Sequence, residues 1–430
     1  MTLLLKGARA IDPQAGLDDI VDVLVEDGKI AEVGKGLSRP GCRELDLAGK
    51  ILVPGLVDIH VHLRDPGQEQ KETIETGTRA AAHGGFTAVC CMPNTAPTID
   101  TAFAVEYVRG TAERVGKCRV HVAGSCTTGL AGEILSDMGD MARHGAVAFT
   151  DDGRGVQGAG MMRRVMDYAH QFGKVIMSHC QDEDLVGDGV VNEGECSTRL
   201  GLLGWPAAGE EIQIARDIAL CRLTGTPLHV QHITTARGVQ LVRDAKAEGL
   251  PVTAEATPHH LFLTDEIIDD TYNANYKVNP PLRTEEDRAA VTAGILDGTI
   301  DCIVTDHAPH CPWEKDCEFE LAKFGMTGLE TSLGLVLTQL VGTGVMGYAR
   351  MVELMAVNPR RIIQVEPVRI AAGSTADITV FDPAVEWTVD ADDFESKSKN
   401  SGFIGAHLKG RATDVLVGGE PTMLDGKVLG

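Results

Sequence analysis

The chain has 430 residues, of which 43% are hydrophobic, 4% are aromatic and 49 are glycine. Its formal net charge of −23 argues against nucleic-acid binding, because phosphate backbones repel acidic surfaces. We also expect no membrane interaction, since no run of about 18 uncharged apolar residues occurs. Residues 1–5 are followed at once by Lys6 and make a poor signal peptide. Eleven cysteines without paired spacing favour a reducing, cytoplasmic location.

Both ends of the chain predict short β-strands. Residues 23–33 place an Asp27-Gly28 turn between alternating apolar runs, which is typical of a β-hairpin. Residues 377–382 and 414–419 predict further strands near the C-terminus. Neither end is long enough for a convincing core of its own. We therefore predict that residues 1–53 and 366–430 pack together as one small β-sandwich domain.

The middle of the chain, residues 54–365, alternates strands with helices. Apolar strand candidates are separated by helical patterns at residues 72–83, 161–172, 210–223 and 236–248. Eight such strands over roughly 300 residues predict an α/β fold of the (β/α)8 TIM-barrel type. Two longer connections, residues 180–209 and 261–283, are candidates for functional loops.

The first strand of this predicted barrel ends with two histidines. His60 and His62 alternate along the strand and project from one face, about 7 Å apart at a rise of roughly 3.3 Å per residue. Two imidazoles placed in this way can bind one cation. Two polar residues of a half-buried strand would give the same pattern, so the other strands must decide between these interpretations.

Several other strands also end in polar residues. In a parallel barrel all these ends open on one face, where active sites are built. A lone histidine after a strand is more often structural, but a whole set on one face favours a site. Four imidazoles and two carboxylates suit zinc or a similar ion, and six ligands suggest two ions sharing a carboxylate. The candidate ligands are His60, His62, one of Asp151 and Asp152, His179, His232 and Asp306.

Such a centre predicts hydrolysis of an amide-like bond, or the reverse reaction. Metal binding lowers the pKa of bound water from about 15.7 to about 7. A neighbouring carboxylate can accept the proton of this water and pass it to a leaving nitrogen.

A set of motifs then carries a family resemblance. They are residues 55–68, 92–95, 149–153, 277–283, 305–310 and 324–325, with a serine- and lysine-rich stretch at 396–400. Over nearly its full length the chain resembles the class I dihydroorotases of the amidohydrolase superfamily. A His-x-His motif alone would indicate only the superfamily.

The resemblance implies two zinc ions per subunit. The ligands would be His60, His62 and Asp306 for one ion, and His179 and His232 for the other. Asp152 would bridge the ions, which leaves Asp151 a supporting role. Many relatives bridge with a carboxylated lysine, and this strand end has no lysine.

The resemblance also implies how substrate is held. Asp306 would be the catalytic group that moves a proton between water and the ring nitrogen. Arg64, Asn94 and His310 would bind the substrate carboxylate, for which arginine is a natural partner. The remaining substrate contacts would come from His62, Asn279, Phe324 and Gly325. Residues 310–325 would form a mobile flap over the site.

The implied function is reversible cyclisation of N-carbamoyl-L-aspartate to L-dihydroorotate in de novo pyrimidine (UMP) synthesis. The implied assemblies are a homodimer and a complex with aspartate transcarbamoylase. One alternative is a related cyclic amidase of the hydantoinase or allantoinase type, which the Asp bridge and Arg64 disfavour. Another is an inactive paralogue that serves only as a structural partner of the transcarbamoylase. Such a chain should have lost metal ligands, and here all six are present.

Overall fold

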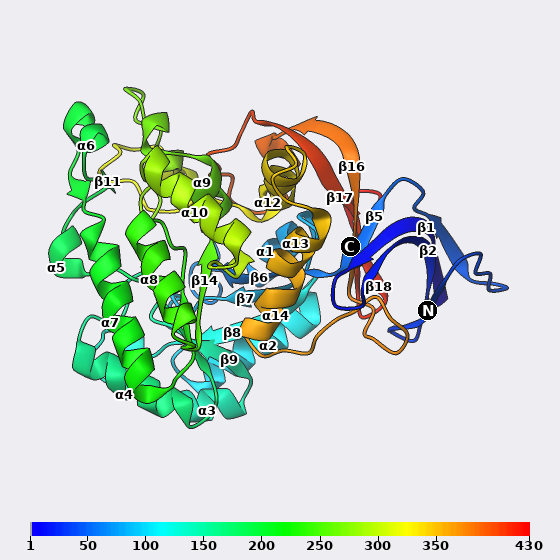
Figure 1. Cartoon of the computed structure of the whole chain (residues 1–430), viewed down its shortest axis with the longest axis horizontal. Coiled ribbons are helices and arrows are strands. Elements are labelled where there is room, and N and C mark those ends of the chain that lie inside the picture. Colours follow the sequence, from blue (N-terminus) through cyan, green and yellow to red (C-terminus); the bar gives the residue numbers. More distant parts are fainter. Residues whose placement is uncertain (1) are drawn as a thin grey trace.

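The computed structural model describes residues 2–430 and contains a barrel with a β domain at one side of it (Figure 1). The barrel strands pair in parallel in chain order, and a bridge between Val61 and His307 links the last strand segment to the first. The predicted TIM barrel is therefore confirmed. Its strands are β6 (Leu56–Val61), β7 (Phe86–Cys91), β8 (Arg119–Gly124), β9 (Ala146–Phe149), β10 (Val175–Ser178), β13 (Leu228–Val230), β14 (Val252–Ala256) and β15 (Cys302–Ile303).

Helices surround the barrel and bury one face each against it. In α1, for example, Thr73 caps the first turn and Ile74, Ala80 and Ala81 point inward. The four predicted helices match α1, α4, α7 and α8 within two residues at each end. The helices between strands are α1 (Ile74–His83), α2 (Ala102–Val115), α3 (Met138–Arg143), α4 (Ala159–His170), α7 (Ala208–Thr224), α8 (Ala236–Ala247) and α10 (Glu285–Asp297), with a short 3-10 turn η1 (Thr128–Leu130).

A run of short helices leads from the barrel to the β domain. Two of its segments, η4 and η5, are π-helical. In order they are α12 (Leu329–Val336), η4 (Leu337–Val341), α13 (Tyr348–Val352), η5 (Glu353–Val357) and α14 (Asn358–Ile362). Within residues 2–430, none of the helices combines the length and apolar composition needed to cross a bilayer.

Both chain ends build the β domain, as predicted. Its sheet has the order β19-β18-β17-β16-β5-β1-β2-β3, with β4 paired to β1. Antiparallel pairing of β5 with β16, which places Ile51 opposite Phe381, joins the N-terminal strands to the C-terminal ones. One face encloses a core that includes Leu3, Val23 and Ile378. The strands are β1 (Thr2–Asp12), β2 (Leu17–Glu26), β3 (Lys29–Gly34), β4 (Arg43–Asp46), β5 (Ile51–Pro54), β16 (Ile378–Thr388), β17 (His407–Val417), β18 (Glu420–Leu424) and β19 (Lys427–Val428).

Two of these strands are longer than their sequence predicts. β16 continues to Thr388 and β17 begins at His407, well outside the predicted ranges 377–382 and 414–419. Their added halves pair Glu386 with Lys409 and carry exposed polar residues, with a bulge after Asp382. The added half of β16 shows no alternation of buried and exposed residues, so periodicity could not reveal it. Residues 407–413 of β17 do alternate, and that signal was available in the sequence.

The two long connections pack together above the carboxyl ends of the barrel strands. Arg283 donates hydrogen bonds to Asn192 Oδ1 (2.9 Å) and the Trp205 carbonyl (3.0 Å), and its guanidinium lies 4.4 Å from the Trp205 ring. These loops therefore form a fixed rim around the strand ends. Their elements are α5 (Glu183–Val186), β11 (Val191–Asn192), α6 (Glu195–Leu200), β12 (Gly204–Trp205), α9 (Pro258–Phe262), η2 (Asp265–Ile267) and η3 (Ala274–Tyr276); α11 (Pro312–Lys315) and η6 (Ala391–Asp393) follow later in the chain.

Candidate metal and substrate site

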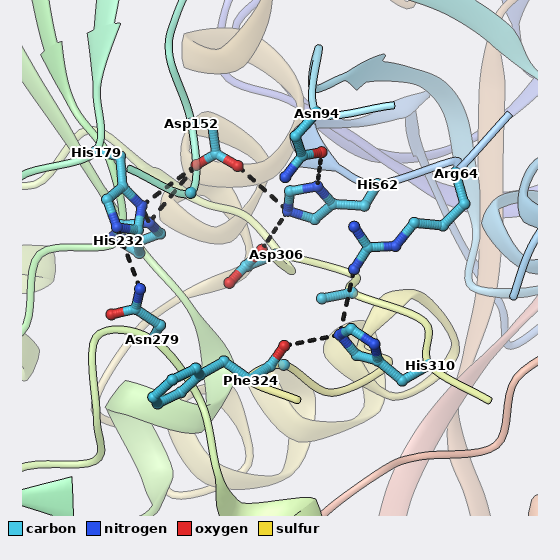
Figure 2. Close-up of a pocket in the computed structure, with 13 residues that line it drawn as sticks. His62, Arg64, Asn94, Asp152, His179, His232, Asn279, Asp306, His310 and Phe324 are labelled. Atoms are coloured by element: carbon cyan, nitrogen blue, oxygen red, sulfur yellow. Dashed lines mark hydrogen bonds and ion pairs between the residues drawn. The ribbon is translucent and has the colours of Figure 1, made fainter. Parts of the chain in front are cut away.

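The carboxyl ends of the barrel strands open into one cavity of about 200 Å³. A cavity of this size suits a single small ring rather than a polymer. Figure 2 shows the side chains that converge on it. His60 is fully buried, and its Nε2 atom lies 3.3 Å from Asp152 and 3.5 Å from Asp306. The lining residues are His62, Arg64, Asn94, Asp152, Gly153, His179, His232, Asn279, Asp306, Ala308, His310, Phe324 and Gly325.

Asp152 lies between two groups of histidines at the centre of the cavity floor. Its Oδ1 atom is 3.3 Å from His60 Nε2 and 3.5 Å from His179 Nδ1. Its other oxygen, Oδ2, is 3.5 Å from His62 Nε2. One carboxylate thus contacts both groups of histidines, as a bridging ligand would.

Asp306 and His232 complete the two groups. Asp306 Oδ1 is 3.0 Å from His62 Nε2 and 3.5 Å from His60 Nε2. On the other side of Asp152, His232 Nε2 is 2.9 Å from His179 Nδ1. All six candidate ligands that the sequence predicts therefore come together in one place.

The hydrogen-bond pattern of the histidines fits a metal. His60 Nδ1 donates to Glu255, His62 Nδ1 donates to Asn94, and His179 Nε2 donates to Gln181. In each case the other ring nitrogen faces the centre of the site, which is the nitrogen through which an imidazole held in this way can bind a metal. Buried His60 Nε2 and Asp152 Oδ1 have no hydrogen-bond partner within the described chain. A cation among these lone pairs would satisfy them.

The electrostatics keep the two acids in their ligand form. Burial alone would raise the pKa of Asp152, but nearby His60 and His179 outweigh it and hold this pKa well below its usual range. Burial is likewise outweighed at Asp306, where His60 and His62 lower the pKa of the carboxyl. Burial next to His179 lowers the pKa of His232 to about 3. Conversely, Glu255, Asp152 and Asp306 outweigh burial at His60 and raise the pKa of this imidazole well above its usual value. The site therefore holds ionised carboxylates beside His60 at neutral pH.

Three site residues adopt left-handed backbone conformations. Arg64 has φ 61°, Asp306 has φ 47° and His232 has φ 28°. Such conformations cost free energy in residues other than glycine, and they cluster at functional sites. Here they occur directly beyond the ends of β6, β13 and β15, where the chain must turn its side chains into the cavity.

The opposite wall carries a buried cation. Arg64 is 7% exposed, and its Nε donates to the Pro309 carbonyl at 3.2 Å. Its Nη2 lies 3.4 Å from His310 Nε2, which donates to the Phe324 carbonyl at 2.7 Å. Within residues 2–430, no carboxylate lies within ion-pairing distance of Arg64, and burial lowers its pKa. An unpaired buried guanidinium facing a cavity is suited to bind an anion.

Sequence reasoning missed two residues that orient this site. Glu255 on β14 accepts from His60 Nδ1 (2.5 Å) and His229 Nε2 (2.9 Å). Gln181 Oε1 lies 3.1 Å from His179 Nε2 and accepts from Asn279 Nδ2 at 2.8 Å. A carboxylate inside the apolar strand β14 was an available signal for Glu255. No feature of the sequence distinguishes Gln181 from an ordinary loop residue.

Two other residues beside the motifs support the cavity from outside. Asp151 accepts from the backbone N–H groups of Cys126 (2.8 Å) and Thr127 (3.0 Å), so it fixes the turn that carries Asp152. His260 pairs through Nε2 with the Pro280 carbonyl at 2.9 Å, next to Asn279.

Substitution of Glu255 tests whether the surrounding residues orient the candidate metal ligands. The Glu255→Gln substitution removes the charge that holds the His60 proton on Nδ1, and we expect metal affinity to fall about 10–100-fold. Competition with a chromophoric chelator would measure this affinity. Asp414→Asn is a matched control, because it alters a buried carboxylate of the β domain, which accepts from Lys50 Nζ at 3.1 Å, and should leave metal affinity unchanged. Equal affinity in wild type and Glu255→Gln would contradict the orienting role.

Comparison with known proteins agrees with this geometry. Residues 49–237 match the family model described as Dihydro-orotase-like. A dihydroorotase from Pelotomaculum thermopropionicum is 49% identical over 425 residues, covering 99% of both chains. A dihydroorotase from Trichlorobacter lovleyi is 48% identical over 98% of this chain and 99% of its own. The chain belongs to the dihydroorotase family.

Solved structures show the same architecture. The L-hydantoinase (dihydropyrimidinase) from Arthrobacter aurescens superimposes with a TM-score of 0.89 at 26% identity, over 100% of this chain and 98% of its own. The dihydropyrimidinase from Brevibacillus agri gives 0.87 at 20% identity, over 100% and 96%. This member of the dihydroorotase family therefore shares its barrel and β domain with enzymes that hydrolyse cyclic amides.

Proposed function

We propose that this chain catalyses the reversible cyclisation of N-carbamoyl-L-aspartate to L-dihydroorotate in pyrimidine (UMP) biosynthesis. Family membership supports this reaction, and the observation that carries it is Arg64. Its buried guanidinium faces the cavity without a carboxylate partner from the described chain. Both the linear and the cyclic substrate bring a carboxylate that would satisfy it.

This observation also separates the proposal from the alternatives. Hydantoin and the dihydropyrimidine rings carry no carboxylate, so they would leave Arg64 buried and unpaired, which costs free energy. An inactive structural paralogue is disfavoured because the six candidate ligands converge on one floor. Neither alternative accounts for both the unpaired guanidinium of Arg64 and the convergence of the six candidate metal ligands.

We propose zinc as the metal, with two ions per subunit. His60, His62 and Asp306 would hold one ion, His179 and His232 the other, with Asp152 between them. When bound, the metal supplies Lewis acidity, which polarises the amide carbonyl and makes water more acidic. The donor set of imidazoles and carboxylates supports this choice.

Asp306 is the proposed proton shuttle. In the hydrolytic direction its carboxylate accepts a proton from the attacking water and delivers it to the ring nitrogen as the C–N bond breaks. In the cyclising direction the proton moves from the carbamoyl nitrogen to the departing water. The lowered pKa of Asp306 keeps the carboxyl in the form that accepts a proton.

The other lining residues would hold the substrate in place. Arg64, Asn94 and His310 would bind its carboxylate. His62, Asn279 and the backbone of Phe324 and Gly325 would contact the ring. These groups lie around the cavity, opposite and beside the candidate metal ligands (Figure 2). Their positions would place the reacting carbonyl over Asp152 and Asp306.

An activity assay tests the proposal. Purified protein should interconvert N-carbamoyl-L-aspartate and L-dihydroorotate, and removing metal with a chelator should abolish turnover. Adding Zn²⁺ back should restore it, and metal analysis of freshly purified protein would give the number of ions. Hydantoin is the control substrate. Turnover of hydantoin without turnover of dihydroorotate would overturn the substrate assignment.

We further propose the organisation in which this activity operates. Residues 54–365 would form the catalytic unit, with 1–53 and 366–430 as the two parts of the β domain. All eleven cysteines are free, which supports a reducing, cytoplasmic location. A homodimer and a complex with aspartate transcarbamoylase are the proposed assemblies, and sedimentation with and without that enzyme would detect them.

A further inference from the structure

Two buried lysines lie behind the wall of the cavity that Phe324 and Gly325 form. Lys277 is 2% exposed and Lys315 is 9% exposed. Their ammonium groups bond to backbone carbonyls rather than to carboxylates. Burying an ammonium group is costly unless its protons are bonded, so these contacts must hold the surrounding backbone closely. Burial lowers the pKa of Lys277 to about 8 and that of Lys315 to about 7.

Lys315 gathers three carbonyls around one ammonium group. Its Nζ atom donates to the carbonyls of Lys323 (2.7 Å) and Gly325 (2.8 Å). A third carbonyl, that of Lys277, accepts at 3.3 Å. Lys315 thereby ties the beginning of the capping segment, defined here as residues 311–325, to the end of the same segment.

Lys277 holds the middle of the capping segment from the other side. Its Nζ atom donates to the carbonyls of Phe319 and Glu320, both at 2.9 Å, and lies 4.5 Å from the ring of Phe324. The Lys277 carbonyl also accepts from the Gly325 backbone N–H at 2.8 Å. The two lysines therefore belong to one continuous set of contacts.

This set of contacts reaches the residues proposed to bind the substrate carboxylate and those proposed to contact its ring. The Phe324 carbonyl accepts from His310 Nε2, and His310 adjoins Arg64 at the carboxylate end. Lys277 precedes Asn279 by two residues on the ring side. Movement of the capping segment would therefore shift groups on both sides of the cavity.

We propose that Lys277 and Lys315 are positioning residues that together hold the capping segment in its substrate-binding conformation. This inference rests on the proposed function, because it assigns the Phe324–Gly325 backbone a contact with the substrate. Neither lysine lines the cavity, so each acts through the backbone that it holds. A role in fold stability alone would lower the unfolding temperature without a selective effect on substrate binding.

Kinetics of Lys315→Met and Lys277→Met test the proposal. Each variant should raise KM for dihydroorotate about tenfold and leave kcat within about threefold, because the lost contacts bind substrate and transition state alike. The double variant should raise KM by less than the product of the single effects, because both lysines hold one segment. Lys323→Met is the matched control, since this exposed lysine lies in the same segment, and its kinetics should equal those of wild type.

Proteolysis provides a measurement that does not depend on activity. Glu318 and Glu320 are exposed in the capping segment, so a glutamate-specific protease should cut there faster in Lys315→Met than in wild type or Lys323→Met. Unchanged KM and unchanged cutting in both single variants, or fully multiplicative KM effects, would overturn the proposal. If one variant does not fold, the other carries the test. Wild-type protein without dihydroorotase activity would refute the proposed function. Proteolysis would still test whether the two lysines hold the capping segment.

Discussion

Replacing Asp306 with asparagine should lower kcat about 10²–10⁴-fold, the usual contribution of a positioned acid–base group. Asparagine keeps an oxygen at the position that lies 3.0 Å from His62 Nε2, but it cannot accept a proton. His60, His62 and Asp152 stay in place, so most metal should remain bound. Rates in both directions and metal content per chain are the measurements.

A control for Asp306 lies next to the same barrel strand, β15, at its other end. Asp301 accepts from Lys246 Nζ (2.6 Å) and the Ala254 backbone N–H (3.0 Å), outside the cavity. Asp301→Asn should therefore lower thermal stability while leaving kcat within about twofold, because the lost contacts lie outside the cavity and act mainly on stability. Near-normal turnover of metal-loaded Asp306→Asn would refute the proton-shuttle role.

Arg64→Met should lower kcat/KM for dihydroorotate roughly 10²-fold or more, because hydrogen bonds to a charged group contribute about 1.5–3 kcal/mol each. The neutral side chain leaves the substrate carboxylate buried without a partner. Steady-state kinetics with dihydroorotate would measure this loss. Dihydrouracil, which has the same ring without the carboxylate, should be turned over no more slowly by the variant than by wild type.

Arg64→Lys separates charge from geometry. Lysine keeps the positive charge but lacks the planar pair of N–H groups, so its kcat/KM should fall between those of wild type and Arg64→Met. Every variant retains a Cβ atom at φ 61°, so the backbone conformation is affected equally. Unchanged kinetics in Arg64→Met would remove the main support for a carboxylated substrate.

Much of the architecture could be predicted because its signals are local. Barrel strands are short apolar runs, and helices such as α1 and α8 show their own periodicity and caps. The ends of parallel strands necessarily meet on one face, so residues such as His60 and His179 could be assigned to one site. That inference needs only the order of elements along the chain.

The residues that hold the site in shape could not be predicted in this way. Gln181 lies in an irregular segment, and Lys315 ends the four-residue helix α11, which is too short to show a period; no motif marks either side chain. Their function comes from contacts with residues distant in sequence, such as Asn279 and Lys277. The extended half of β16 was missed for a related reason. Its strand conformation comes from pairing with β17, a segment distant in sequence, and not from its own residue pattern.

The pairing of β5 with β16 has a consequence for synthesis of the protein. Ile51–Pro54 is buried in the finished sheet, yet its partner begins only at Ile378. At ribosomal rates of about 5–20 residues per second, tens of seconds separate the emergence of the two strands. During that interval an apolar strand edge is bare, and such edges promote aggregation. Yield in the cell should therefore depend on chaperones that shield the nascent N-terminal strands until translation ends.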